Sequence, residues 1–361
     1  VASAREALAA GAPPADTRFA DNLAAQFSIG YGDVAAAFEA AAHVVSLDLD
    51  QHKTGGHPME CRGMLAEYDA ALDALTVWDG TQMPHRAREI IVKVLGWSED
   101  RVRVICPDVG GGFGPKFVIY SEEITIPLAA YLLRRPVKWI EDRREHFTAT
   151  TMERDQYWKV DAAVDARGVL LGMKVDMIHD HGAATPHGIN IPQNSATNTL
   201  GPYRLPNFAF TASVVLTNKT PVTPTRGAGR PQGTFAMERV LDAVAAKIGL
   251  DRAEVRRRNL IGPDEMPYAT PLKTRDGGIM TYDSGDYPAA QALALEKAGY
   301  ADFSERQSAA RAQGRYIGLG LANYVEGSGR GPFESALVRI GPTGRVVVGT
   351  GATAQGQGVA T

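Results

Sequence analysis

The order of apolar and polar residues along the chain predicts short strands, some paired as hairpins, separated by amphipathic helices. Strand patterns, either alternating or continuously apolar, occur at 44–50, 75–79, 101–106, 137–141 and 208–216. The segments 157–164 and 169–179 flank a turn-forming sequence at 165–168, which predicts a hairpin. The sequence Gly341-Pro342-Thr343-Gly344 predicts a second turn, between the last two strands.

Helices are predicted where apolar residues recur with a period near 3.6. The segments are 31–42, 84–97, 122–133, 231–248 and 251–260. The clearest begins at Pro231, and Asp251 with Glu254 resembles a capping box at the start of the last one. Because hairpins and helices are mixed without a steady strand–helix–strand alternation, the pattern indicates an α+β fold rather than a doubly wound sheet.

Composition narrows the class of protein. The chain has 361 residues, of which 44% are hydrophobic and 22% charged, with a formal net charge of -3. These values are typical of a globular protein with two or more domains, and no basic block favours nucleic-acid binding. The apolar runs are too short to span a bilayer, and no signal peptide opens the sequence. Cys61 and Cys106, the two cysteines, cannot form a disulfide framework, which favours a reducing, cytoplasmic location.

Three glycine-rich segments are the most informative feature. They lie at 110–116, 225–232 and 354–358, and each holds a polar or aromatic residue at its centre. Glycine lets the backbone approach a ligand closely and adopt positive φ. Three such segments, each more than a hundred residues from the next, therefore predict one large, extended, polar ligand.

The first segment fails the tests for common nucleotide-binding loops. A P-loop requires glycine directly before lysine and then serine or threonine, whereas Pro115 precedes Lys116 and Phe117 follows it. In a dinucleotide fingerprint, the third glycine would fall on Pro115. Any one glycine-rich turn is more often structural than functional, so the argument depends on the three segments together.

In this order, the segments resemble the cofactor loops of the large subunit of the xanthine oxidase family, the molybdenum hydroxylases. Among its members, the chain is most similar to those resembling carbon monoxide dehydrogenase and aldehyde oxidoreductase. Gly110–Lys116 matches the first loop, Arg226–Gln232 the second, and Gln355–Gly358 with Thr361 the third. The resemblance implies three parts: 1–50, a lead-in and the end of a hammerhead-like domain; 51–275, a first molybdopterin-binding domain; and 276–361, the incomplete start of a second.

The resemblance also implies a function. The cofactor would be molybdopterin with molybdenum, as the cytosine dinucleotide, and the reaction would hydroxylate an aldehyde or an N-heterocyclic carbon with oxygen from water. Electrons would leave through an iron–sulfur small subunit and an FAD medium subunit. Gln82 matches the glutamine that contacts a metal oxo group. The cofactor-binding positions are Gly111, Gly112, Phe113, Gly114, Arg226, Gly227, Gly356, Gln357 and Gly358.

Departures from the family pattern narrow the substrate. Phe117 and Ala228 stand where purine-oxidising members have a glutamate and a stacking phenylalanine. Gly227 replaces the cysteine that bridges copper in carbon monoxide dehydrogenases. These departures argue against purines and carbon monoxide, and they predict a pocket for an aldehyde or a modest aromatic heterocycle.

Family subunits are about twice this long, and their catalytic glutamate lies in a late segment. We therefore expect a central fragment or one half of a split large subunit, with the general base outside this chain and supplied by a second large-subunit chain. The alternative is a non-catalytic cofactor-binding or assembly module that is inactive without a partner.

Other catalytic or metal sites have weaker support. His179 and His181 share one face of a strand near His187, so a metal site is conceivable, but hydrogen-bonded histidines are the favoured interpretation. Glu60 is interpreted as part of a structural turn in the cofactor wall. No Gly-x-Ser-x-Gly motif favours a hydrolase.

Overall fold

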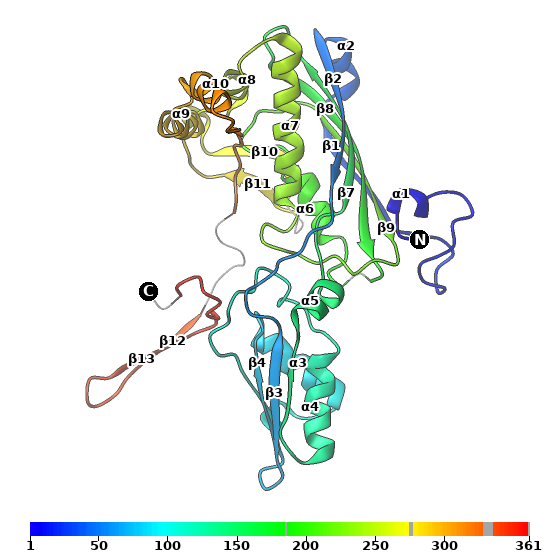
Figure 1. Ribbon diagram of the computed structural model, residues 1–361, viewed down its shortest axis with the longest axis vertical. Helices are drawn as coiled ribbons and strands as arrows, with labels where there is room; N and C mark the ends of the chain where they lie inside the picture. The colour runs from blue at the N-terminus through cyan, green and yellow to red at the C-terminus, as the bar shows by residue number, and fades with distance from the viewer. Residues whose placement is uncertain (185, 274–276, 328–334, 360–361) are drawn as a thin grey trace. The chain divides into compact units, whose positions relative to one another are not determined.

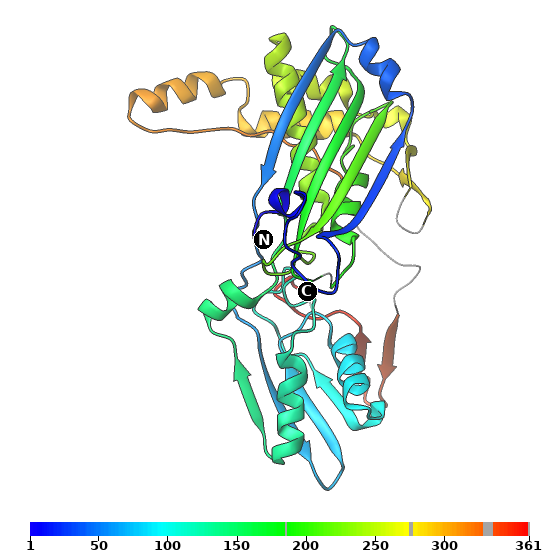
Figure 2. The ribbon, with the colours of Figure 1, turned by 90° about the vertical axis from the view of Figure 1, so that its right-hand side faces the viewer.

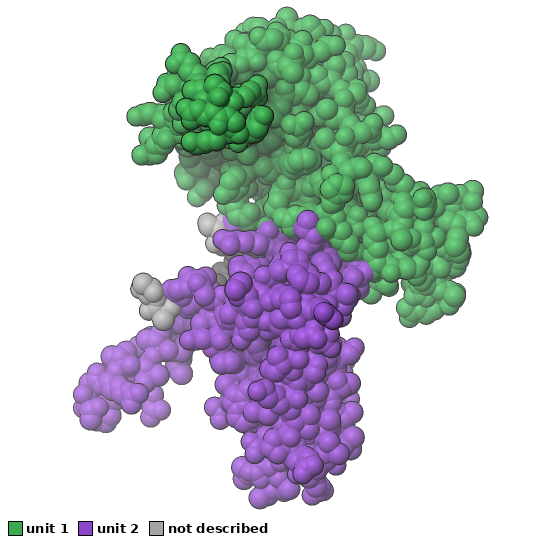
Figure 3. All heavy atoms as spheres, in the orientation of Figure 1, with its two compact units in different colours: residues 1–53, 154–219, 227–326 green, residues 54–153, 220–226, 327–361 purple. Residues whose placement is uncertain are grey.

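The computed structural model describes residues 1–184, 186–273, 277–327 and 335–359 (Figure 1). The chain forms two compact units (Figure 3), between which it passes repeatedly. Unit 1 comprises Val1–Lys53, Arg154–Lys219 and Gly227–Glu326, and unit 2 comprises Thr54–Glu153, Thr220–Arg226 and Gly327–Thr361. The sequence-based division at residues 50 and 275 remains a prediction.

Unit 1 is built on a five-stranded sheet in the order β1-β9-β8-β7-β2 (Figure 2). Its strands are β1 (Leu23–Tyr31), β2 (His43–Gln51), β7 (Gln156–Val164), β8 (Leu170–Gly182) and β9 (Phe208–Leu216). β8 and β9 are parallel, and the other pairs are antiparallel. The hairpin predicted around 165–168 is confirmed as β7 and β8, with Trp158 opposite Met177.

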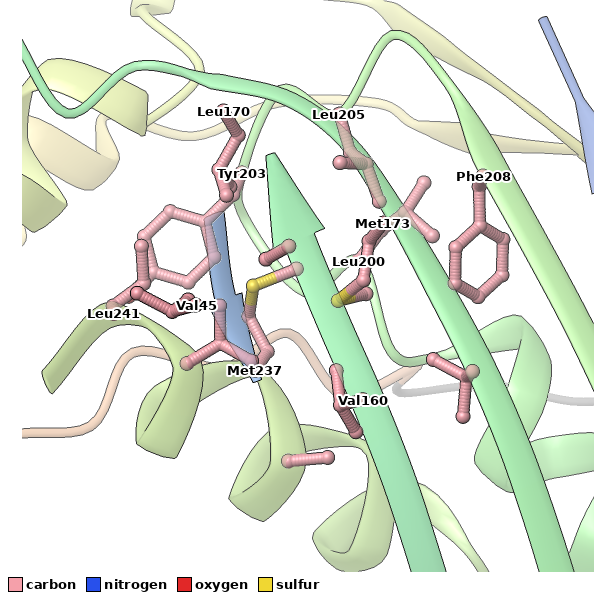
Figure 4. Packing of buried hydrophobic residues seen from close by; sticks show 14 of the residues in the cluster. Val45, Val160, Leu170, Met173, Leu200, Tyr203, Leu205, Phe208, Met237 and Leu241 are labelled. Carbon is pink, nitrogen blue, oxygen red and sulfur yellow. The ribbon is translucent and has the colours of Figure 1, made fainter. Parts of the chain in front are cut away.

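Helix α7 (Arg230–Ile248) packs on β2 and β7, and α6 (Asn190–Thr197) packs on α7. The apolar face predicted for α7 is buried through Met237, Val240, Leu241, Val244 and Ala245. It meets the inward side chains of the sheet, as Figure 4 shows for Met237 and Leu241 beside Val45, Val160 and Met173. This contact forms the main hydrophobic core of unit 1.

Unit 1 has further short helices and strands. They are α1 (Ala4–Ala7), α2 (Val34–Glu39), α8 (Arg252–Asn259), η2 (Pro263–Glu265), β10 (Tyr268–Lys273), β11 (Ile279–Tyr282), α9 (Tyr287–Ala298) and α10 (Phe303–Ala312). The Asp251 side chain accepts hydrogen bonds from the N–H groups of Ala253 and Glu254, which confirms the predicted cap of α8.

Unit 2 has a smaller, four-stranded sheet in the order β5-β4-β3-β6. The strands are β3 (Gly63–Asp69), β4 (Ala74–Asp79), β5 (Val102–Ile105) and β6 (Val137–Ile140). Helices α3 (Pro84–Leu95) and α4 (Glu122–Leu133) pack against it around a small apolar cluster that includes Leu75, Val77 and Ile91. Unit 2 also has two short helices, η1 (Glu99–Arg101) and α5 (Arg143–Ala149).

Unit 2 also contains an antiparallel hairpin of β12 (Ala336–Ile340) and β13 (Val346–Thr350). Its turn lies at the predicted position, where the Gly344 N–H donates to the Gly341 carbonyl. Every residue of both strands is exposed.

Mixed sheets with helices packed on them confirm the predicted α+β class. The helix predicted over 31–42 is present as the shorter α2 (Val34–Glu39), whereas the preceding edge strand β1 (Leu23–Tyr31) was not predicted. Pairing with β9 and packing of Phe27, Ile29 and Tyr31 on the core outweigh the weak local signal of an alanine-rich sequence. Among the described helices, none is both long and apolar enough for a membrane crossing.

Candidate functional site

The first glycine segment is a loop of unit 2 that follows β5 and has an unusual backbone. Gly111, Phe113 and Gly114 have φ of +100°, +56° and +113°. A Cβ built on Gly114 would overlap the carbonyl oxygen of Pro224, just before the second glycine segment. Gly114 is therefore needed both for its conformation and for the close approach of two distant parts of the chain.

The second segment lies against this loop through its first residues. The Arg226 N–H donates to the Phe113 carbonyl at 2.9 Å. The Arg226 side chain is exposed, and its guanidinium has no hydrogen bond or ion pair with any residue that the structure describes.

The third segment reaches the same loop. The Val109 N–H donates to the Ala354 carbonyl at 2.9 Å, and a Cβ on Gly112 would lie 2.7 Å from Oε1 of Gln355. The first and third segments and the first residues of the second, Thr225 and Arg226, thus meet within unit 2, as one shared ligand would require.

Gln82, which follows β4, is fixed beside the loop. Its N–H donates to the Lys116 carbonyl at 2.9 Å, and its side-chain Oε1 accepts from the Gly114 N–H at 2.8 Å. A Cβ on Gly112 would lie 2.5 Å from Cδ of Gln82. Because Oε1 faces the loop, the amide NH2 faces away from the Gly114 N–H, and it has no hydrogen-bond partner among the described residues.

The tip of the loop carries further donors without partners. Neither the N–H of Gly112, which is buried, nor that of Phe113, an exposed residue, has a hydrogen-bond partner within the described parts of the chain. Buried backbone N–H groups are rarely left unpaired in folded proteins. Together with the Gln82 amide, these groups form a set of donors suited to a ligand rich in oxygen and negative charge.

Glu60 bridges the first and last residues of the loop. Its Oε2 accepts from the Gly110 N–H at 2.7 Å and from the Lys116 ammonium at 2.9 Å. Partial burial favours the protonated acid, but Lys116 and the Gly110 N–H stabilise the carboxylate more, so the pKa of Glu60 lies below its ordinary value. The expected structural role for Glu60 agrees with these contacts.

A pair of buried acids lies in the same unit. Asp79 is the last residue of β4, Glu123 is the second residue of α4, and both line a small cavity with Lys116 and Arg62. Burial raises the pKa of Asp79 to about 6, and burial together with the Asp79 charge raises that of Glu123. Sequence reasoning missed this pair because the two residues belong to separate elements.

Other predicted residues take local roles. The Gln357 amide folds back on its own segment, donating to the Thr353 carbonyl and accepting from the Gln355 N–H, between Gly356 and Gly358, whose φ are +91° and +76°. Thr361 lies outside the described residues.

The two predicted substrate residues belong to different units. Phe117, in unit 2, is 45% exposed, and its N–H donates to the Gly114 carbonyl. Gly227 and Ala228 belong to unit 1, where the Ala228 carbonyl accepts from Asn194 at 2.8 Å. The predicted pocket that uses both Phe117 and Ala228 stays a prediction.

The histidines of β8 are joined by a hydrogen bond, as the sequence favoured, but Nε2 of His181 is buried without a hydrogen-bond partner among the described residues. Nδ1 of His179 accepts from the Gln156 amide at 3.1 Å, and the facing nitrogens of His179 and His181 are 3.0 Å apart. Burial lowers the pKa of His181 to about 4 and that of His179 well below its ordinary value, so both are neutral near pH 7.

A second cluster with possible ligand atoms is explained by an ion-pair network. Cys61, Glu141 and His146 have ligand atoms within 4.8 Å of one another. The Glu141 carboxylate, however, already accepts from Arg62, Thr150 and His146. Burial opposes its charge, but these donors outweigh burial and lower its pKa to about 2. The geometry therefore favours a structural role.

Comparison with known proteins agrees with this geometry. Residues 16–260 match one family of molybdopterin cofactor-binding domains, and residues 293–361 match another with the same description. The chain is 39% identical over 344 residues to the 6-hydroxypseudooxynicotine dehydrogenase complex subunit gamma of Paenarthrobacter nicotinovorans, covering 94% of this chain and 43% of that protein. It is 34% identical to the nicotine 6-hydroxylase large subunit of the same organism, covering 96% and 44%.

Solved structures give the same result. Quinoline 2-oxidoreductase from Pseudomonas putida 86 matches with a TM-score of 0.90 and 34% identity over 99% of this chain and 47% of that one. Carbon monoxide dehydrogenase from Oligotropha carboxidovorans matches with a TM-score of 0.78 and 29% identity, over 93% and 44%. The chain thus spans less than half the length of these relatives, and it belongs to the molybdopterin-binding domains of the xanthine oxidase family.

Proposed function

We propose that this chain is the molybdopterin-binding part of a hydroxylase that oxidises a ring carbon of an N-heterocycle, with water as the source of oxygen. Two of the similar proteins are named for nicotine and quinoline, which are both aromatic N-heterocycles. Their names favour a heterocycle over the aldehyde that the sequence left equally open. Gly227 in place of a copper-bridging cysteine argues against carbon monoxide as the substrate.

Three hydrogen-bond donors at the first glycine loop that lack partners among the described residues are the main support for this proposal. The N–H groups of Gly112 and Phe113 and the amide NH2 of Gln82 all lack partners among the described residues. Molybdopterin offers phosphate and pterin acceptors for such donors, so the residues present would fit it. When bound, the cofactor supplies the two-electron redox chemistry.

The chain's own residues would bind and orient the cofactor. Gln82 donates from its NH2 to an oxygen atom of the cofactor, because its Oε1 is already used by the Gly114 N–H. The Gly112 and Phe113 N–H groups donate to further oxygen or nitrogen atoms, and the Arg226 guanidinium supplies positive charge for an anionic part of the cofactor. Gly356, Gln357 and Gly358 approach from the third segment.

The remaining parts of the proposal come from the family. The similar proteins are named as a complex subunit, a large subunit and a large chain, which supports assembly with other subunits. That these are an iron–sulfur and an FAD subunit is part of the proposal. The cytosine dinucleotide form, the cytoplasmic location and a general base from a second large-subunit chain belong to the same proposal. Phe117 and Ala228 would line the substrate pocket.

The assembled complex tests the proposal directly. We expect molybdenum and a pterin in the purified complex, and turnover of quinoline- or nicotine-like substrates with an artificial electron acceptor. Absence of both molybdenum and pterin would contradict the binding proposal. Cofactor without turnover of any heterocycle or aldehyde would instead favour the non-catalytic module.

Gln82→Glu isolates the role of the amide. The carboxylate can still accept from the Gly114 N–H, but it no longer presents an NH2 donor. We expect kcat to fall by roughly 10²-fold, the usual effect of losing one positioned donor in an active site. Gln82→Ala, which also loses the loop contact, should reduce cofactor content as well. A Gln82→Glu enzyme with wild-type kcat would exclude the donor role.

A further inference from the structure

Glu60 joins the two ends of the first glycine loop with one carboxylate oxygen. Oε2 accepts from the N–H of Gly110, the first residue of the loop, at 2.7 Å, and from the ammonium of Lys116, the last, at 2.9 Å. The Glu60 N–H also donates to the Gly110 carbonyl at 3.2 Å. A Cβ on Gly110 would lie 2.6 Å from Cβ of Glu60, so a larger residue would separate them.

The two partners of this ion pair differ in burial. The Lys116 side chain is 1% exposed, whereas that of Glu60 is 48% exposed. Among the described residues, Glu60 is the only carboxylate within ion-pair distance of Lys116. A buried ammonium that loses its partner is much less stable than a half-exposed carboxylate, which water can solvate. The position of Lys116 therefore depends on Glu60 more than the reverse.

Lys116 transmits this constraint to Gln82. Its carbonyl accepts from the Gln82 N–H at 2.9 Å and from the Thr81 hydroxyl at 3.3 Å. The Gln82 side chain in turn holds the Gly114 N–H. One continuous set of contacts thus links Glu60 to the Gln82 amide, at the loop whose tip carries N–H groups without partners among the described residues.

We propose that Glu60 is a positioning residue: by holding Lys116 and Gly110, it sets the shape of the glycine loop and the orientation of the Gln82 amide for the cofactor. The effect on the cofactor rests on the function proposed above, whereas the effect on the loop does not. The lowered pKa of Glu60 is consistent with a charged carboxylate in this position at neutral pH.

Four variants of the full chain, purified with its partner subunits, test this role: Glu60→Gln, Lys116→Met, the double variant, and Glu60→Asp. Glu89→Gln is the matched control, since Glu89 forms an exposed ion pair with Arg86 on α3 of the same unit. Hydrogen exchange is measured on peptides covering 110–117 and on the rest of unit 2. Molybdenum and pterin are measured per chain.

In Glu60→Gln, we expect exchange in 110–117 to speed up and cofactor content to fall, each by roughly tenfold or more, as for other residues that orient ligand-binding groups. Lys116→Met should have a smaller effect, because it leaves a carboxylate that water reaches. The double variant should resemble Lys116→Met rather than Glu60→Gln, since it removes the unpaired ammonium. Glu60→Asp, which keeps the charge, should lie nearer the wild type, and it serves as the test if Glu60→Gln is not recovered.

Exchange in 110–117 and cofactor content equal to those of Glu89→Gln would overturn the proposal. So would faster exchange spread evenly over unit 2, which would indicate general support of the fold. If the wild-type complex itself holds neither molybdenum nor pterin, the proposed function fails, while the exchange measurements still decide the role of Glu60 in the loop.

Discussion

Units 1 and 2 have different interiors. In unit 1, long strands and the face of α7 bury large apolar side chains such as Trp158, Phe208 and Phe210. Unit 1 also buries charged groups, among them the Arg256–Glu238 ion pair, but they are few beside its large apolar core. In unit 2, the apolar cluster is small, so buried charged groups such as Arg62, Glu141 and Lys116 make up a larger part of the interior. Burial of apolar side chains stabilises a fold but does not orient particular groups toward a ligand. Buried charges and hydrogen bonds, by contrast, fix the directions of particular groups. We therefore expect stability and cofactor binding to be separable by mutation.

The largest loss of stability is expected from truncating the core of unit 1. Phe210 is 1% exposed, and its ring packs edge-on against Trp158 with centroids 5.4 Å apart. Phe210→Ala should lower the free energy of unfolding by about 3–5 kcal/mol, because it removes a large buried side chain and leaves a cavity. Denaturant unfolding gives the total, and hydrogen exchange of peptides from each unit locates the loss.

If the interiors act separately, exchange should rise in β7, β8 and β9 and stay unchanged in the loop at 110–117. An equal rise in both units would show that they unfold as one cooperative structure, and the comparison would then apply only to their chemistry.

A smaller loss of stability with a larger loss of cofactor is expected at Gly114. Gly114→Ala places a side chain at φ +113° and against the Pro224 carbonyl, so the loop must shift. We expect a cost of about 1–3 kcal/mol from backbone strain, together with loss of most of the molybdenum. Gly96→Ala is the matched control: Gly96 also has positive φ, +67°, but a Cβ there meets nothing within 4 Å.

Gly96→Ala should lower stability by a similar or smaller amount and leave the molybdenum content unchanged. A Gly114→Ala complex that keeps its molybdenum would show that the close approach of the first two segments is not needed for binding.

How much of the two units can be predicted from the sequence depends on how far apart the interacting residues lie along the chain. Local periodicity was sufficient for α3, α7 and the β7–β8 hairpin, because their apolar faces recur within the element itself. The three glycine segments could be recognised because each is a short, continuous motif. Strand β1 could not be predicted, since its pairing with β9 joins residues nearly 190 positions apart, such as Gln26 and Ser213.

The same limit applies to the site. Gln82 was predicted as a site residue from the resemblance to the family, but its amide orientation depends on the N–H of Gly114, which is distant in sequence. The sequence likewise gave no reason to connect Glu60 with Lys116, or Asp79 with Glu123. Such pairs form only when the fold is complete, because neither member has a local pattern that identifies the other.

An effect on stability no larger than that of Gly114→Ala is expected from the carboxyl pair of unit 2, and it should depend on pH. The pKa of Asp79 rises from an ordinary 3.8 to about 6 on folding, mainly through burial. A raised pKa means that folded protein binds the proton more tightly than unfolded protein, so this stabilisation is complete below about pH 4 and is lost as pH rises through about 6. Through this group, the wild type should lose about 1–3 kcal/mol of stability between pH 4 and pH 7. Asp79→Asn cannot ionise, so it should not show this loss.

Thermal unfolding of the wild type, Asp79→Asn and the exposed-acid control Glu89→Gln across this range measures the effect. Glu141, whose pKa is lowered to about 2, acts in the opposite direction: its contribution is present above its ordinary 4.5 and is lost as the solution becomes more acidic. The pH dependence caused by Asp79 should therefore appear between pH 4 and pH 7, and that caused by Glu141 below pH 4.5. If the stability of Asp79→Asn and that of the wild type changed equally over pH 4–7, the ionisation of Asp79 would not affect stability. The buried acids of unit 2 would then not distinguish it from the apolar core of unit 1.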